Sequence, residues 1–462
     1  MKSINALIQK FIIILKTIFR KPIWLLLDIY EKTPISSKYR ALKRFDDAAG
    51  KNKLFFTNSI FRNGFTDQLF AMKFFHRLGD SINMNYHFVQ MKSKRSHQES
   101  MLKYSATVLK GKKNKVNIAG YSNQESYSDI YDFLGVNEYL KNSVNKQPGN
   151  NCHEITFNLD EIELSNRMIR SWDFFTSEIK FRLDSMIDYS RDNMIHLKGL
   201  DTVFKLFRLS ETSNTPEIPF RKIYDLNRVL KPRENLHKTT GIKLLVHIRQ
   251  GDTAILKTPW DTYIQSWYKA KDRFIEHATF ETADTFENIP VSQFYRFLKD
   301  FFDVYESFKF STLVFSDGFS RAFHEIYRVN KFLYTKEKMH KLIENEKNYN
   351  NIEFNDFITW QEVTTVIGEE NEKLYDFIHS FMVSDIVVTG TQQKMIPKLI
   401  RLFCTPDNMP FMITLYREKE PFVDYLGIES EHKFRLNINI DNYDMNEIKN
   451  VIQVYFEERN LK

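Results

Sequence analysis

The chain has little cysteine: its 462 residues contain two, Cys152 and Cys404, which lie far apart in the sequence. Two such residues cannot build a framework of structural disulfides, and their separation does not match the close ligand spacing of a zinc site. This usage is typical of proteins that work in a reducing compartment. The composition therefore excludes the small, disulfide-stapled domains of secreted proteins.

Several common motifs are also missing. The chain has no glycine-rich phosphate-binding loop, and its 14 glycines are scattered along the sequence. It has no Asp-x-Asp pair and no internal repeat. A site for a phosphorylated ligand would therefore need other groups, such as an arginine side chain or the backbone amides at a helix start.

No apolar run is long enough to span a membrane as a helix. The most apolar region, residues 4–27, is interrupted by basic residues and by Pro22, and a spanning helix needs roughly 20 uninterrupted apolar residues. No small-residue cleavage site of a signal peptide follows this region. Apolar residues within it recur at helical spacing: Ile4, Leu7, Ile8, Phe11, Ile12, Leu15, Ile18 and Phe19.

Positive charge is concentrated in the same region. Residues 1–40 carry eight basic and two acidic side chains, so nearly all of the formal net charge of +7 lies there. An amphipathic helix that lies on an anionic membrane surface fits this pattern, because apolar burial and charge attraction both hold it there. We therefore predict that residues 1–45 form a membrane-associating segment. The alternative is a helix packed on the protein itself.

The rest of the chain is nearly neutral, which argues against the basic face expected of a nucleic-acid-binding domain. Hydrophobic residues make up 42% of the chain and aromatic residues 15%, which is ample for packed cores. A length of 462 residues exceeds one ordinary core, so we expect two sizeable domains.

Short apolar segments alternate with helical patterns, which predicts an α/β fold with doubly wound parallel sheets. We expect one domain over residues 46–230, a linker over 231–240, a second domain over 241–425 and a helical tail over 426–462. The clearest helix is 292–308. The expected strands are 53–56, 85–90, 116–118, 243–248, 312–315, 351–354, 385–388 and 411–414.

The most distinctive polar residues follow the expected strand 243–248. There the apolar run gives way to Arg249, Gly251 and Asp252, at the carboxyl end where open α/β sheets bind ligands. A guanidinium can grip two oxygens of a diphosphate, and Gly251 lets the backbone come close. Asp252 can orient the arginine or bond a sugar hydroxyl. The alternative is a strand-end salt bridge followed by an ordinary turn.

Two further segments also place polar residues directly after an expected strand. Residues 63–70, Asn-Gly-Phe-Thr-Asp-Gln-Leu-Phe, follow the expected strand 53–56 and open a helical pattern. Residues 384–393 are typical of a strand that ends in the polar turn Thr391-Gln392-Gln393 before a helix. Donors at either helix start can bind an anion, although ordinary capping explains the same residues without a ligand.

Together these segments resemble the fucosyltransferase superfamily. Residues 247–252, His-Ile-Arg-Gln-Gly-Asp, are similar to the His-x-Arg-Arg-Gly-Asp signature of bacterial α-1,2-fucosyltransferases, with Gln250 replacing the second arginine. The likeness to α-1,6- and protein O-fucosyltransferases is looser. Residues 63–70 are similar to the motif Gly-Gly-Leu-Gly-Asn-Gln-Leu-Phe, from which Asn63, Thr66 and Asp67 depart. Residues 384–393 resemble the last family motif, Asp-x-x-Val-x-Thr followed by a hydroxyl-rich loop.

The resemblance implies a GT-B-like fold, in which two Rossmann-like domains face a cleft. It implies inverting transfer, in which Arg249 stabilises the departing diphosphate and neither a metal nor another cofactor is needed. The implied catalytic residues are Arg249 and Asp252, and the general base stays open between Asp252, Asp67 and Asp261. The implied donor-binding residues are His247, Gly251, Asp317, Asp356, Thr391, Gln392 and Gln393, and those on the acceptor side are Asn63, Gly64 and Gln68.

The resemblance, together with the basic amphipathic segment, thus implies a bacterial glycosyltransferase at the cytoplasmic face of the inner membrane. It would move L-fucose from GDP-fucose to a hydroxyl of a glycan, free or lipid-linked, in surface polysaccharide biosynthesis. One alternative is a glycosyltransferase for a different nucleotide sugar, because Gln250 and the turn at residues 390–393 could reshape the donor pocket. The other is a catalytically inactive membrane scaffold that keeps the fold.

Overall fold

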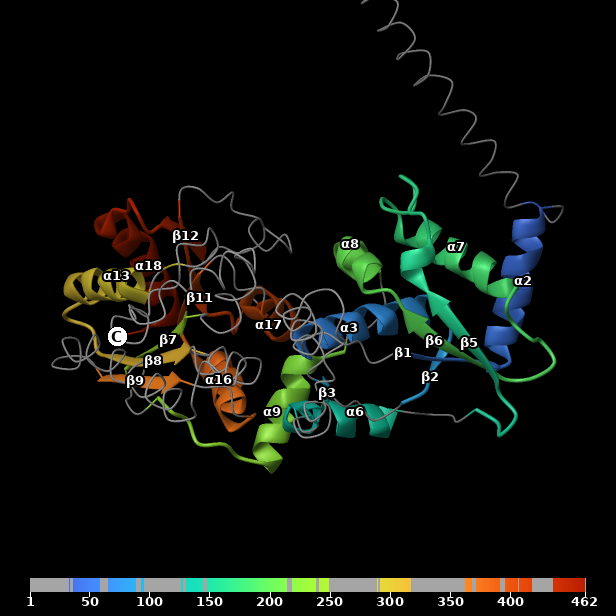
Figure 1. Cartoon of the computed structure of the whole chain (residues 1–462), viewed down its shortest axis with the longest axis horizontal. Coiled ribbons are helices and arrows are strands. Elements are labelled where there is room, and N and C mark those ends of the chain that lie inside the picture. Colours follow the sequence, from blue (N-terminus) through green and yellow to red (C-terminus); the bar gives the residue numbers. More distant parts are fainter. Residues whose placement is uncertain are drawn as a thin grey trace, which may run out of the picture. The chain divides into compact units, whose positions relative to one another are not determined.

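The computed structural model describes residues 33, 36–58, 65–88, 93–94, 126–127, 130–143, 148–213, 218–237, 241–248, 289, 291–316, 362–367, 371–390, 395–405, 407–417 and 435–461. Within them the chain is an α/β protein with two parallel sheets (Figure 1). It divides into two compact units. The first unit combines Met1–Phe61, Leu69–Gln90 and Leu140–Ile218, and the second combines Arg62–Gln68, Met91–Tyr139 and Pro219–Lys462.

The sheet of the first unit has four parallel strands in the order β2 (Asn85–Tyr86), β1 (Leu54–Asn58), β6 (Asn193–Lys198) and β5 (His153–Asn158). Every residue of β1 is buried, as expected of a strand covered on both faces. The helices of this unit, with the short turn η1 (Leu159–Glu161), are α2 (Ser37–Gly50), most of α3 (Phe65–Ser81), the end of α6 (Val136–Ser143), α7 (Trp172–Asp184) and α8 (Leu200–Ser210).

The second unit contains a six-stranded parallel sheet in the order β12-β11-β10-β7-β8-β9. Its strands are β7 (Ile242–Ile248), β8 (Phe310–Ser316), β9 (Glu362–Ile367), β10 (Ile386–Gly390), β11 (Phe411–Tyr416) and β12 (Arg435–Asn439). From the centre of the sheet, β7, β8 and β9 follow one another outward to one edge. On the other side of the centre, β10, β11 and β12 follow one another outward to the opposite edge. This is the strand order of dinucleotide-binding folds, and its topological switch point lies between β7 and β10.

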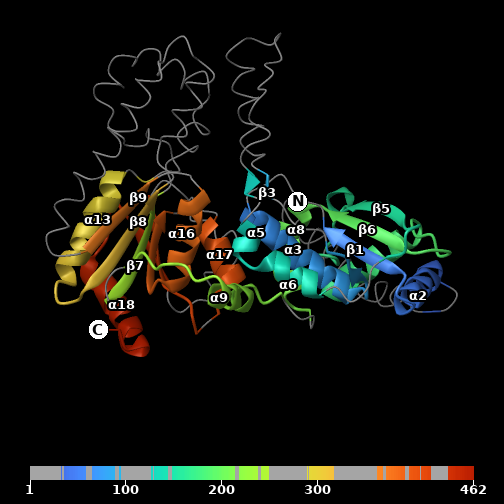
Figure 2. The same cartoon turned by 90° about the horizontal axis from the view of Figure 1, so that it is seen from below.

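The remaining elements of the second unit are helical, apart from the short antiparallel pair β3 (Ser93–Lys94) and β4 (Ser126–Tyr127). Figures 1 and 2 show α13 and α18 on one side of the six-stranded sheet and α16 on the other. The helices are α5 (Ile130–Phe133), α9 (Phe220–Leu230), α13 (Val291–Val304), α16 (Asn371–Val383), α17 (Met395–Phe403) and α18 (Met445–Arg459).

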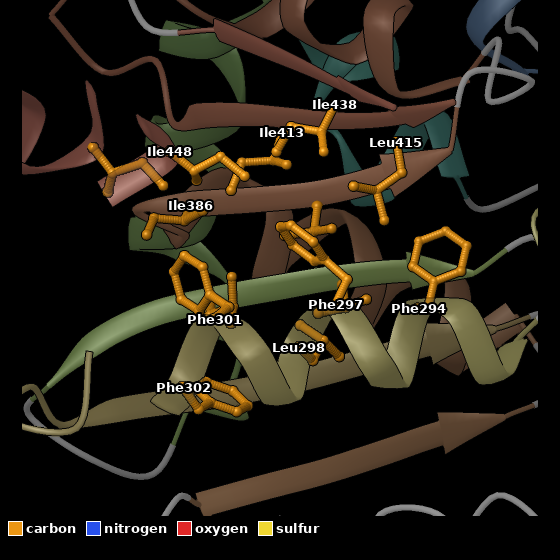
Figure 3. Close-up of a cluster of buried hydrophobic side chains, with 14 of the residues drawn as sticks. Phe294, Phe297, Leu298, Phe301, Phe302, Ile386, Ile413, Leu415, Ile438 and Ile448 are labelled. Atoms are coloured by element: carbon orange, nitrogen blue, oxygen red, sulfur yellow. The ribbon is translucent and has the colours of Figure 1, made fainter. Parts of the chain in front are cut away.

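The core of the second unit follows from the two periodicities of its sequence. Alternate residues of β7, among them Leu244 and Val246, point to the face covered by α13, because side chains alternate along a strand. The aromatic residues of α13 recur at helical spacing, so Phe294, Phe297 and Phe301 meet that face together (Figure 3). Isoleucine and leucine side chains from β10, β11 and β12 complete the cluster: Ile386, Ile413, Leu415 and Ile438.

Most expected strands are confirmed, and several elements were not foreseen. Strands 53–56, 243–248, 312–315, 385–388 and 411–414 correspond to β1, β7, β8, β10 and β11 within a few residues. Of the expected strand 85–90 the structure describes residues 85–88, and within these Asn85 and Tyr86 form β2, which pairs with β1. The expected strands 116–118 and 351–354 lie outside the described residues. Four further strands of the two parallel sheets, β5, β6, β9 and β12, were not expected from the sequence.

The division of the chain also differs from the expected boundaries. Residues 231–237 of the expected linker pack within the second unit, where Arg233 forms an ion pair with Asp376 of α16, 2.6 Å between Nη2 and Oδ1. His237 is buried, and its Nδ1 donates to the Ser311 carbonyl oxygen over 2.9 Å. This burial lowers the pKa of His237 to about 4. The expected helical tail supplies the edge strand β12 as well as α18.

In the part of the chain that the structure describes, none of the helices has both the length and the apolar character needed to cross a membrane.

Candidate functional site

The strands that precede three of the predicted donor-site residues, Arg249, Asp317 and Thr391, end next to one another in the second unit. His247 of β7 pairs in register with Thr389 of β10, and Ile248 pairs with Ser316 of β8. Parallel strands point their carboxyl ends to one edge, and ligands bind there at the switch point. Arg249, Asp317 and Thr391 each directly follow one of these strands, and the three strand ends are neighbours on this edge.

Most predicted site residues themselves lie outside the described residues. This applies to Asn63, Gly64, Arg249, Gly251, Asp252, Asp317, Asp356, Thr391, Gln392 and Gln393, and also to the base candidate Asp261. The structure describes His247, Gln68 and the base candidate Asp67, together with the strands and helices that flank the other residues.

His247 lies on the face of the sheet opposite α13, one residue before the end of β7. It is 8% exposed, and its ring lies 4.8 Å from that of Phe377 in α16, measured between centroids. Phe315 of β8 packs on the same phenyl ring at 5.4 Å. The imidazole is thus held against α16 beside the strand ends. Its implied contact with the donor stays a prediction.

Gln68 belongs to the first turn of α3, which is part of the second unit. It is 1% exposed, and its Oε1 accepts a hydrogen bond of 2.5 Å from the Tyr131 hydroxyl of α5. Burial, and secondarily the charge of Asp67, raises the pKa of Tyr131, so the phenol stays a donor. This burial favours a supporting role for Gln68 over direct contact with an acceptor.

Asp67, beside Gln68, forms an ion pair with Lys398 of α17 in the same unit. Both side chains are largely buried, at 19% and 12% exposure. Asp67 lies in the first turn of α3 and Lys398 is the fourth residue of α17. The pair therefore joins the starts of two helices: α3 begins within the predicted motif 63–70, and α17 begins just after the predicted motif 384–393.

A second group of contacts, which sequence reasoning missed, fixes α5 against α9. The Asn227 side chain donates to the carbonyl oxygens of Asp132 and Phe133, over 3.0 and 2.7 Å. Gly135 has a φ of +79°, and a Cβ added there would lie 2.8 Å from the Asn227 Cβ. The Phe133 ring stacks on Tyr375 of α16 at 4.5 Å. The position of Tyr131 therefore depends on contacts that no local sequence motif predicts.

The first unit has an open cavity of about 740 Å³ beyond the carboxyl end of β5. One of its carboxylates, Asp160, accepts a hydrogen bond of 2.8 Å from the Thr202 backbone amide and so caps α8. The lining is Asp160, Ile162, Glu163, Leu164, Ile169, Asp201, Thr202 and Lys205. Three carboxylates against one lysine disfavour an anionic ligand such as a nucleoside diphosphate at this cavity.

Comparison with known proteins adds no relative. No protein-family model matches the chain, and no curated protein matches it in sequence. Within the residues that the structure describes, no three His, Cys, Asp or Glu side chains are grouped so that they could hold a metal ion. A functional assignment therefore has to come from the strand-end geometry and from the residues that follow these strands.

Proposed function

We propose that the protein is an inverting glycosyltransferase of the GT-B type that uses a GDP-sugar, with L-fucose as the transferred sugar. The proposed donor site is the carboxyl edge of the six-stranded sheet in the second unit. A hydroxyl of a glycan, free or lipid-linked, is the proposed acceptor. The setting that we propose is the synthesis of a surface polysaccharide at the cytoplasmic face of the membrane.

One observation carries this proposal. The predicted site residues Arg249, Asp317 and Thr391 are far apart in the sequence, yet the strands directly before them, β7, β8 and β10, are neighbours. The first and last of these strands border the switch point, where doubly wound sheets bind nucleotides. A chance set of strand-end turns would have no reason to gather at this point of the sheet.

The proposed chemistry is a displacement at the anomeric carbon. The acceptor oxygen forms a bond to that carbon, the carbon–oxygen bond to the β-phosphate breaks, and the bonding electron pair leaves with the diphosphate. A general base takes the acceptor proton. Arg249 would stabilise the growing charge on the β-phosphate. Because Asp67 is already engaged by Lys398, Asp252 and Asp261 are the better base candidates.

Thermal unfolding with GDP-, UDP- and CMP-sugars tests the proposal. A ligand that binds only the folded protein stabilises it, by about 2.7 kcal/mol at a concentration of 100 times its Kd. We expect GDP-fucose to raise the melting temperature more than UDP- or CMP-sugars do. Stabilisation by a UDP- or CMP-sugar without a response to GDP-fucose would reject the donor, and no response to any nucleotide sugar would reject the function.

Attachment to an anionic membrane surface through residues 1–40 belongs to the same proposal. Residues 1–32 lie outside the described residues, so this attachment stays a prediction from the distribution of apolar and basic side chains.

A further inference from the structure

Helix α9, light green in Figure 1, exposes large apolar side chains that do not pack in the core. Its buried side chains are Phe220, Ile223, Tyr224 and Asn227. Its outer face carries Leu226, Val229 and Leu230, which are 58%, 78% and 79% exposed. These three residues have the i, i+3 and i+4 spacing of neighbours on a helix surface, so they form one continuous apolar stripe. The helix is therefore apolar on two faces, and only one of them is buried.

The contacts of the buried face fix the orientation of α9. The Asn227 side chain donates to two backbone carbonyl oxygens of α5, as described above. Arg228 Nη2 donates to the Phe133 carbonyl oxygen over 2.6 Å, and its guanidinium lies over the rings of Phe133 and Tyr224. The helix cannot rotate to bury the stripe without breaking these contacts. Apolar side chains that stay gathered on the surface in this way mark an interaction surface.

Basic side chains accompany the stripe. Residues 220–234 carry five basic and two acidic side chains, whereas the chain after residue 40 is nearly neutral as a whole. Lys222 lies one turn before the stripe on the same helix face, Lys231 ends the helix, and both are exposed. The acidic residue of α9, Asp225, is paired with Arg221, whose Nε lies 3.0 Å from each carboxylate oxygen. The stripe is thus flanked by net positive charge.

This combination fits an anionic membrane surface better than another protein. Helices that lie on a membrane bind through apolar burial together with the attraction of lysine and arginine to acidic lipids. A two-fold contact between copies of the chain would bring the same lysines together. Three side chains also expose less than the roughly 800 Å² that each partner buries in a stable protein interface. The proposed attachment through residues 1–40 involves the same kind of partner.

We propose that the stripe formed by Leu226, Val229 and Leu230 inserts into the headgroup layer of an anionic membrane, with Lys222 and Lys231 at the lipid phosphates. The second unit then has its own membrane contact, in addition to residues 1–40. This inference extends the membrane setting of the proposed function, and it requires neither the donor nor the transfer reaction.

Titrations of the full-length protein with vesicles of equal parts phosphatidylglycerol and phosphatidylcholine test the inference. The triple variant Leu226→Gln/Val229→Gln/Leu230→Gln keeps a high helix propensity and removes the apolar stripe. We expect it to bind these vesicles about tenfold or more weakly, because each buried apolar side chain adds to the affinity. The loss adds to any contribution of residues 1–40, since linked contacts reinforce one another.

A second variant tests the role of the charge. We expect Lys222→Gln/Lys231→Gln to weaken binding to the anionic vesicles by about fivefold for each lysine. On vesicles of phosphatidylcholine alone this loss should disappear, because the lipid surface carries no net charge. High salt should reduce the difference between this variant and the wild type on anionic vesicles.

Helix α18 of the same unit provides the matched control. Its Val451 and Val454 are 41% and 49% exposed and lie three residues apart, but they have no third large apolar neighbour on the exposed face. Val451→Gln/Val454→Gln should keep the wild-type affinity for the anionic vesicles. Melting temperatures equal to that of the wild type show that each variant folds.

A fluorescence probe locates the lipid directly. Lipids with brominated acyl chains quench a tryptophan that lies among the chains, so Val229→Trp should gain a quenched component. Val454→Trp should gain none. The five native tryptophans are common to both variants and to the wild type, so the added component is read by difference.

Wild-type vesicle affinity in the folded triple variant would overturn the inference, as would a Val229→Trp protein without added quenching or a wild-type protein that does not bind the anionic vesicles. A triple variant that turns a dimer into a monomer in light scattering, with unchanged vesicle affinity, would assign the stripe to contact between copies. If the triple variant does not fold, Val229→Gln takes its place. A protein that responds to no nucleotide sugar loses the proposed function, while a stripe-dependent vesicle affinity would still establish this contact.

Discussion

Replacing Arg249 with alanine is expected to lower the rate of sugar transfer by about 10²-fold or more, equivalent to roughly 3 kcal/mol of transition-state stabilisation. The arginine directly follows β7 at the switch point, where the diphosphate would leave. Charge grows on the β-phosphate as the bond to the sugar breaks, so a fixed guanidinium stabilises the transition state more than the bound donor. The loss should therefore appear mainly in kcat, measured with donor at saturation.

A matched arginine provides the control. Arg417 directly follows β11, as Arg249 follows β7, but β11 lies beyond the switch point and Arg417 pairs with Asp441. Arg417→Ala should keep transfer within a few-fold of wild type. Arg249→Lys should be intermediate, because lysine retains the charge and loses the bidentate fork. Wild-type transfer by a folded Arg249→Ala variant would show that the guanidinium has no catalytic role.

Truncating Leu298 is expected to destabilise the second unit by about 2 to 5 kcal/mol. This side chain is fully buried between α13 and the sheet, so alanine would remove apolar contacts and leave a cavity (Figure 3). Leu226 of α9, in the same unit, is 58% exposed, and Leu226→Ala should cost about 0.5 kcal/mol or less. Chemical denaturation of both variants measures the difference. Equal losses would mean that the α13 face is not the core.

The parts of the fold that sequence patterns predicted are those with one strong local signal. The strands β7, β10 and β11 are continuous apolar runs, as buried parallel strands require, and α13 repeats its aromatic residues at helical spacing. By contrast, β5 and β6 mix polar and apolar residues. His153 and Glu154 in β5, and His196 in β6, interrupt the apolar pattern because side chains of these edge and near-edge strands reach partly exposed surface.

The expected linker 231–240 differs from the structure because it was predicted from its local composition, whereas its residues make contacts with distant parts of the chain. Pro232 and its polar neighbours are typical of a linker, yet Arg233 pairs with Asp376, which lies far along the chain. His237 has no motif that predicts its burial between Ser311 and Ser384. The tail contains a strand in which polar and apolar residues alternate, followed by a helix, and only the sheet order shows that β12 completes the sheet.

The strands that lead into the candidate site were predictable, and its supporting contacts were not. Arg249 and Thr391 follow the apolar runs of β7 and β10, and that both belong to one site stays a prediction. The pair between Asp67 and Lys398 joins residues more than 300 positions apart, and no local sequence pattern links the two. The hydrogen bond from Tyr131 to Gln68 is likewise not predicted by any local sequence pattern.

The most direct test of the central claim is to map where a nucleotide sugar binds. Hydrogen–deuterium exchange of the full-length protein, with and without GDP-fucose, compares the backbone amides of each segment. We expect protection in peptides that contain the ends of β7 and β10, with residues 249–252 and 391–395, and none in α18. Protection confined to the first unit, or none at a saturating concentration of GDP-fucose, would contradict the assignment of the donor site to the switch point of the second sheet.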